Sequence, residues 1–129
     1  MQSSRLEAAA LRQRRAGRRA SCCQPESPEP DLRPLDGPTA IADLAAYGKA
    51  LGQATRVRVL RLLLQKEGRA LSELAEQLGI APSTLSEHLS VLREAGLVRD
   101  HGESDCGHRA CYCIDPRALR RLRALFVSL

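Results

Sequence analysis

The stretch of sequence that decides the fold is LSELAEQLGIAPSTLSEHLSVLREAGLV, residues 71–98. Apolar residues recur at helical spacing in two short segments, which predict one helix over 71–79 and a second over 82–95. A tight turn at Gly79 separates the two helices, and Gly96 ends the second. Two short helices joined in this way are typical of a helix-turn-helix, whose second helix lies in the major groove of DNA.

The second helix of this pair is polar near its start. Short hydroxyls there can reach phosphates or base edges, and a carboxylate can accept a hydrogen bond from cytosine N4. The same side chains also suit a plain helix cap in solvent. His88 lies on the inner face, where packing between helices is the alternative to a DNA contact. The candidate DNA-contacting residues of this helix are Ser83, Thr84, Ser86, Glu87 and His88.

Two short segments with strand character follow, at 97–101 and 109–114, and a polar loop joins them. They predict a β-hairpin. A hairpin directly after the second helix completes a winged helix-turn-helix, so the expected fold is mainly α with a β-hairpin wing. Arg99 and Arg109 flank the wing and are candidates for phosphate or minor-groove contacts, although a solvated hairpin face explains them nearly as well.

Two helices are predicted before this motif. Thr39 is expected to cap the first, whose apolar positions run to Leu51. The second, over 54–66, carries a wide apolar stripe and is stopped by Gly68, so it is expected to be the central core helix. The predicted core positions of this helix are Val57, Val59, Leu60, Leu62, Leu63 and Leu64.

A last helix is predicted from Pro116, because proline suits a first helical position. Apolar residues repeat along one face of this helix, and arginines occupy the rest. The predicted apolar face consists of Leu119, Leu122, Leu125 and Phe126, and the predicted exposed arginines are Arg117, Arg120, Arg121 and Arg123.

The first 38 residues are predicted to form a flexible arm, and residues 39–129 a DNA-binding and dimerisation domain. Five prolines between 25 and 38 disfavour regular structure in the second half of the arm. The first 20 residues account for the whole net charge of +5, because six arginines there face one glutamate. This basic run either assists DNA binding electrostatically or is a solvated tail.

Two classes of protein are not expected from this sequence. No apolar run approaches the ~20 residues that a membrane-spanning helix needs, and no apolar stretch of a secretory signal follows the basic start. A cytoplasmic protein without a membrane partner is therefore expected. The sequence also contains no glycine-rich phosphate loop, no nucleophile elbow and no paired-carboxylate pattern, so we do not expect an enzyme.

Three motifs carry a family resemblance: LGQATRVRVL at 51–60, STLSEHL at 83–89 and LREAGLV at 92–98. Together they resemble the ArsR/SmtB family of metalloregulatory winged-helix repressors, over residues 40–129. The resemblance implies a homodimer whose first and last helices form the interface, bound to palindromic double-stranded operator DNA and released when an inducer binds. Glu87 departs from the His or Gln that family members often carry there, so the operator sequence stays open.

The family's two familiar metal sites are missing from the matching positions. The Cys-x-Cys of the first DNA-binding helix has no counterpart, since residues 69–74 read RALSEL. The site of Asp, His and Glu on the final helix is absent as well, because none of these residues occurs in 116–129. Cys22 and Cys23, in the run CCQP, resemble instead the N-terminal thiol pair of some arsenite-responsive members.

The five cysteines favour metal or redox chemistry. Their odd number and their adjacent or alternating positions argue against a disulfide framework in a reducing compartment. Cys111 and Cys113 alternate along a strand, so both side chains point to one face and can share an ion, although buried packing explains them too. The candidate metal ligands are Cys22, Cys23, Cys111 and Cys113, followed by Cys106 and His108.

Thiolates prefer soft ions, so the expected inducer is Hg(II) or As(III)/Sb(III). The arm thiols would close over the hairpin pair and complete a three-thiolate site, within or between subunits. An ion that pinned the arm to the hairpin would move the two recognition helices out of register with successive major grooves. The alternatives are a Cd/Zn/Pb-responsive repressor, a thiol redox-sensing repressor of the same fold, and a purely structural zinc site.

Overall fold

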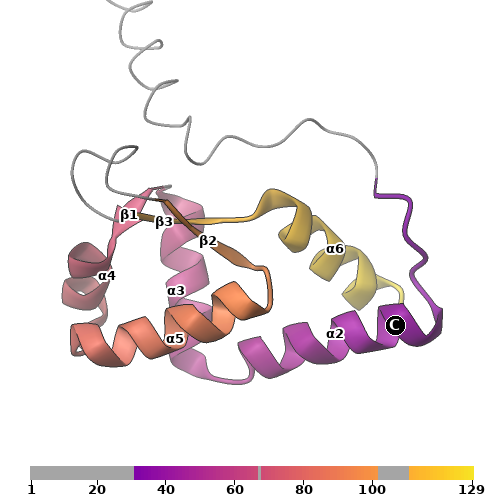
Figure 1. The fold of residues 1–129 in the computed structure, drawn as a ribbon, viewed down its shortest axis with the longest axis horizontal. Helices are drawn as coiled ribbons and strands as arrows, with labels where there is room; N and C mark the ends of the chain where they lie inside the picture. Colours follow the sequence, from indigo (N-terminus) through magenta and orange to yellow (C-terminus); the bar gives the residue numbers. More distant parts are fainter. Residues whose placement is uncertain (1–30, 67, 102–110) are drawn as a thin grey trace, which may run out of the picture.

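The computed structural model describes residues 31–66, 68–101 and 111–129 (Figure 1). The helices in these residues are α2 (Gly37–Leu51), α3 (Ala54–Gln65), α4 (Leu71–Leu78), α5 (Pro82–Glu94) and α6 (Pro116–Val127). The strands are β1 (Arg69–Ala70), β2 (Val98–His101) and β3 (Cys111–Ile114). None of the described helices combines the length and the apolar character that a membrane crossing needs.

The helix-turn-helix forms as predicted from α4 and α5. Gly79 ends α4 in the left-handed conformation, with a φ of 66°, and its backbone N–H donates to the Glu76 carbonyl at 3.3 Å. Pro82 lies in the first turn of α5, where a helix needs no N–H donor. Gly96 follows α5 with a φ of 80° and lets the chain turn toward β2. The helices predicted over 71–79 and 82–95 are therefore confirmed.

A small antiparallel sheet combines two strands that follow α5 with one that precedes α4. β2 and β3 are the two strands of the predicted hairpin, with Val98 opposite Ile114. β1 pairs with the other edge of β3, so that the strand order is β1-β3-β2. β1 has only two residues, too few for an alternating pattern to predict it. With this sheet, the described residues form a mainly helical winged helix-turn-helix, as expected.

α3 is the central helix, but its buried stripe is narrower than predicted. Val59, Leu60 and Leu63 are buried, whereas Val57 is 40% exposed and Leu64 is 50% exposed. At 3.6 residues per turn, positions 57 and 64 lie about 100° from the middle of the stripe that the three buried residues define. The prediction of core positions at Val57 and Leu64 is therefore wrong. The largest fully buried leucines come from α3, α4, α5 and α6 and from the turn between α5 and β2: Leu63, Leu74, Leu85, Leu89, Leu92, Leu97 and Leu125.

The start of α2 differs from the prediction. The helix begins at Gly37, so Asp36 takes the N-cap position, and the predicted cap by Thr39 is wrong. Pro38 enters the first turn, because proline is tolerated there and has its φ already set for a helix. Residues 31–36 form no regular element before α2.

α6 packs along α2 at one end of the molecule, and it confirms the helix predicted after Asp115 (Figure 1). Leu122 and Leu125 are buried as expected, but Phe126 is 49% exposed. Arg121 was predicted to be exposed, and this is wrong: only 1% of its side chain is exposed, in an ion pair with Asp43. Helical periodicity cannot reveal this burial, because the partner comes from α2, 78 residues earlier in the chain.

Candidate nucleic-acid interface and thiol groups

The first turns of α5 present a polar outer surface. Ser83, Thr84, Ser86 and Glu87 are all exposed, whereas the inner face of the same helix is buried. Leu85, Leu89 and Leu92 form that inner face and fix the rotation of the helix about its axis. The hydroxyls of this outer surface can therefore donate to phosphates and base edges without first breaking a packed contact.

His88 takes a different position from the other candidates. It is half-buried, and the Arg56 Nε donates a hydrogen bond to His88 Nδ1 at 3.3 Å. This arrangement agrees with the packing alternative for His88. Arg56 was missed in the sequence, because helical periodicity says nothing about a contact between α3 and α5, 32 residues apart.

The two helices of the motif are acidic. Among their charged side chains, four are carboxylates, and the one full cation, Arg93, is 2.7 Å from the Asp100 carboxylate. DNA phosphates are attracted by Lys and Arg, so α4 and α5 contribute little of this attraction themselves. Exposed cations of the described residues lie elsewhere, including Arg58 and Arg61 on α3.

Arg99 lies on β2 and is bound to the start of α6. Its Nη2 is 2.9 Å from Asp115 Oδ1, and both side chains are about a quarter exposed. Burial raises the pKa of the Asp115 carboxyl, but the hydrogen bonds from Arg99 and from the Arg117 backbone N–H outweigh this effect, so the pKa lies below its ordinary value. Any contact of Arg99 with a phosphate must compete with this ion pair.

Cys111 and Cys113 share one face of β3, as predicted, since burial alternates along the strand. Each cysteine is only 1% exposed, whereas Tyr112 between them is half-buried. Cys111 is disulfide-bonded, although the cysteine pattern argued against a disulfide framework. Burial at this level also agrees with the packing alternative.

The remaining candidates lie outside the described residues: Cys22, Cys23, Cys106, His108 and Arg109. Within 31–66, 68–101 and 111–129, no three side chains of His, Cys, Asp or Glu gather in a way that would hold a metal ion. The described part of the chain therefore brings together two of the predicted thiol ligands, Cys111 and Cys113, and no third ligand.

Known proteins are similar to this chain over the helix-turn-helix. The family model of the bacterial regulatory proteins of the arsR family matches residues 53–100. An uncharacterised HTH-type transcriptional regulator of Mycobacterium tuberculosis is 37% identical over 54 residues, which are 42% of this chain and 47% of the relative. The chain thus spans about half the length of this relative.

Solved structures extend the similarity to most of the described residues. The homodimeric winged helix-turn-helix DNA-binding domain of a possible ArsR-family regulator from Mycobacterium bovis is 33% identical, with a TM-score of 0.57, over 70% of this chain and 80% of that one. A possible transcriptional regulator for arsenical resistance is 36% identical, with a TM-score of 0.55, over 62% of this chain and 79% of that one. Reduced HlyU from Vibrio cholerae is 25% identical, with a TM-score of 0.56, over 70% of this chain and 92% of that one. The chain belongs to the ArsR family of bacterial transcriptional regulators.

Proposed function

We propose that this regulator is a homodimeric repressor that binds double-stranded palindromic operator DNA through α5 and is released when an inducer reacts with its thiols. The observation that carries the proposal is the outer surface of α5. Ser83, Thr84 and Ser86 are exposed there on a helix whose opposite face is fixed in the core. A helix presented in this way, directly before a β-hairpin, fits the major groove.

Exposed apolar side chains on the paired helices α2 and α6 support a dimer. Ile41 on α2 is 68% exposed, and Phe126 at the end of α6 is 49% exposed. Val127 and Leu129 follow at 87% and 86% exposed. Large apolar groups gathered at one end of a small domain favour association with a second copy. The M. bovis relative is homodimeric, and α2 and α6 are the first and last of the described helices.

Fluorescence anisotropy on DNA from the gene's own upstream region tests the proposal. The triple variant Ser83→Ala, Thr84→Ala, Ser86→Ala should bind at least about tenfold more weakly than the wild type, because several phosphate or base contacts are removed. Thr39→Ala is the control, since Thr39 is an exposed hydroxyl on α2, away from α5. Equal affinity of the triple variant and the wild type would contradict a role of α5 in binding.

For the inducer, we propose a thiophilic ion, Hg(II) or As(III)/Sb(III). Cys111 and Cys113 place two sulfur atoms on the same face of β3, and soft ions prefer such ligands. Cys22 and Cys23 are the proposed further ligands, with Cys106 as the next candidate. The pair fits this role only in its reduced form, because a disulfide sulfur is not a thiolate ligand. Its burial also means that the wing must open before an ion can enter.

Thiol redox sensing is the second candidate, and the disulfide of Cys111 favours it. A disulfide at Cys111 ties β3 covalently to another cysteine, so its formation or reduction can change how β3 and α5 fit DNA together. Oxidation joins two thiols with loss of two electrons and two protons to an oxidant such as peroxide, which becomes water. The relative HlyU was solved in a form described as reduced.

A single set of titrations separates the two candidates. Reduced protein on operator DNA is exposed in parallel to Hg(II), arsenite, Cd(II), Zn(II) and peroxide. Release by one thiophilic ion, abolished in Cys111→Ser and Cys23→Ser, supports the metal sensor. Release by peroxide alone, reversed by a dithiol reductant, contradicts it and supports redox sensing.

A further inference from the structure

Arg56, in the first turn of α3, joins three helices. Its Nε donates to His88 Nδ1 on α5 at 3.3 Å. Its Nη1 donates to the carbonyl oxygens of Lys49 at 3.3 Å and Ala50 at 3.5 Å, in the last turn of α2. The last carbonyls of a helix have no donor within the helix, so the guanidinium also caps the C-terminus of α2 by donating to two of them.

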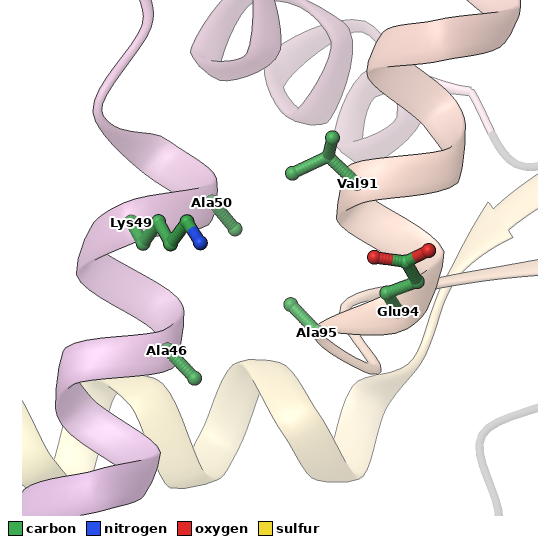
Figure 2. Close-up of a pocket in the computed structure, with 6 residues that line it drawn as sticks. All are labelled: Ala46, Lys49, Ala50, Val91, Glu94 and Ala95. Carbon is green, nitrogen blue, oxygen red and sulfur yellow. The ribbon is translucent and has the colours of Figure 1, made fainter.

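The contact between α2 and α5 is otherwise loosely filled. An open pocket of about 190 Å³ lies between the two helices, and Figure 2 shows small apolar side chains on both of its walls beside the longer, charged side chains of Lys49 and Glu94. Ala46, Lys49 and Ala50 on α2 form one wall; Val91 and Glu94 on α5, with Ala95 directly after it, form the other. The alanines and the valine of this lining make few van der Waals contacts across such a gap, so apolar packing holds the two helices only weakly here.

His88 is placed to couple the position of α5 to that of α2. It lies three residues before Val91 and seven before Ala95, so the three share the α5 face that looks toward α2. Because His88 Nδ1 accepts the hydrogen bond from Arg56, the imidazole must carry its proton on Nε2. The bridge from Lys49 and Ala50 through Arg56 to His88 therefore spans the same junction as the pocket.

We propose that Arg56 is a positioning residue for DNA recognition: through His88, it sets the position of α5 relative to α2. This inference rests on the proposed function, in which α5 binds operator DNA and α2 belongs to the dimer interface. In a dimer, the position of α5 relative to α2 determines the spacing of the two recognition helices, which must match successive major grooves.

Operator affinity of four variants tests the inference. Arg56→Gln and His88→Leu should each weaken binding by about tenfold, and the double variant should lose little more, because both remove the same bridge. His88→Asn should restore most of the affinity, since its side-chain oxygen can accept from Arg56 near the position of Nδ1. Gln65→Ala, which changes an exposed and uncharged side chain on the same helix, is the control and should leave the affinity unchanged.

The imidazole tautomer provides a readout that a general loss of stability would not give. Long-range ¹H–¹⁵N spectra of the wild type should report the Nε2–H tautomer of His88, and Arg56→Gln should yield a mixture of tautomers. Circular dichroism confirms that each variant is folded. If Arg56→Gln does not fold, the comparison of His88→Leu with His88→Asn decides, because both leave Arg56 bound to the end of α2.

The possible failures are distinguishable. If the wild type does not bind operator DNA, the proposed function and the inference are both overturned. If the wild type binds and Arg56→Gln and His88→Leu bind equally well, only the inference is overturned. The inference is also overturned if His88→Asn binds the operator no more tightly than His88→Leu, or if the wild-type imidazole is protonated on Nδ1.

Discussion

Arg121 is the more deeply buried of two buried arginines among the described residues, at 2% exposed against 7% for Arg69. Its Nη2 is 3.3 Å from Asp43 Oδ2, and its Nη1 donates to the carbonyl oxygens of Arg33 at 3.2 Å and Pro34 at 2.9 Å. A buried guanidinium is tolerated only when its donors find acceptors, and these contacts supply them. Arg121 thereby joins α6 to α2 and to the segment that leads into α2.

Replacement of Arg121 tests this role. Arg121→Met should lower the free energy of unfolding by about 2 kcal/mol, because Asp43 and two carbonyls lose their donor. Urea denaturation monitored by circular dichroism measures the change. Arg120→Met is the matched control on the exposed face of α6 and should change stability by less than about 0.5 kcal/mol. Equal effects of the two substitutions would contradict the structural role of Arg121.

Asp115 is the second residue with a defined electrostatic role. It caps α6, since Oδ1 accepts from the backbone N–H of Arg117 at 2.9 Å, and it also pairs with Arg99. Asp115→Ala should lower the free energy of unfolding by about 1 kcal/mol, the usual value of such a cap. Thermal denaturation at neutral pH measures this, and an unchanged midpoint would contradict the cap.

The lowered pKa of Asp115 also predicts a pH dependence. A carboxyl whose pKa is lower in the folded state stabilises the fold above its unfolded pKa of about 3.9, and this contribution disappears as the pH falls through the folded value. Asp115→Asn keeps a good capping residue but does not titrate. The difference in stability between wild type and Asp115→Asn should therefore shrink between about pH 6 and pH 2. A difference that stays constant would contradict the lowered pKa.

At the scale of elements, the sequence predicted those with strong local signals. The glycines and prolines that bound α4 and α5 act through their own backbone conformations, so both helices could be predicted closely. β1 could not be predicted, because its two residues become a strand only by pairing with β3, about 40 residues later. The start of α2 was also misplaced, since Thr39 is a good cap by type but Pro38 already lies within the helix.

Gly79 allows a direct test of the turn. Its φ is positive, at 66°, and an added Cβ would meet no atom within 4 Å, so Gly79→Ala should destabilise by about 1 kcal/mol through backbone strain alone. Gly48 lies within helix α2 and also has open space around it. Gly48→Ala should therefore stabilise the protein by about 0.5–1 kcal/mol. Chemical denaturation compares the two, and the same sign for both would contradict the assigned conformations.

At the scale of the whole molecule, the proposed dimer depends on surfaces that the single chain leaves exposed. Phe126→Glu should convert the protein to a monomer, because it places a charge in the apolar end of α6. Leu64→Glu is a matched control, since Leu64 on α3 is 50% exposed, against 49% for Phe126. Sedimentation velocity measures the mass. A dimer that survives Phe126→Glu, or that is lost in Leu64→Glu, would contradict the proposed interface.

The candidate site could be predicted only in part. The outer face of α5 follows from helical periodicity, and so its exposed hydroxyls were predicted correctly. The common face of Cys111 and Cys113 follows from strand alternation in the same way. Whether that face is buried depends on what packs over it, and a period of two residues carries no such information. The Arg56–His88 and Arg121–Asp43 contacts depend on tertiary structure and leave no local pattern.

Backbone amide shifts report whether the outer face of α5 binds DNA. The ¹⁵N-labelled, reduced protein is titrated with DNA from its own upstream region. The largest shifts are expected at residues 83–87 on α5 and in the wing strands, with smaller changes in α2 and α6. Shift changes that are absent from α5 and concentrated in α2 or α6 would contradict DNA binding by the outer face of α5.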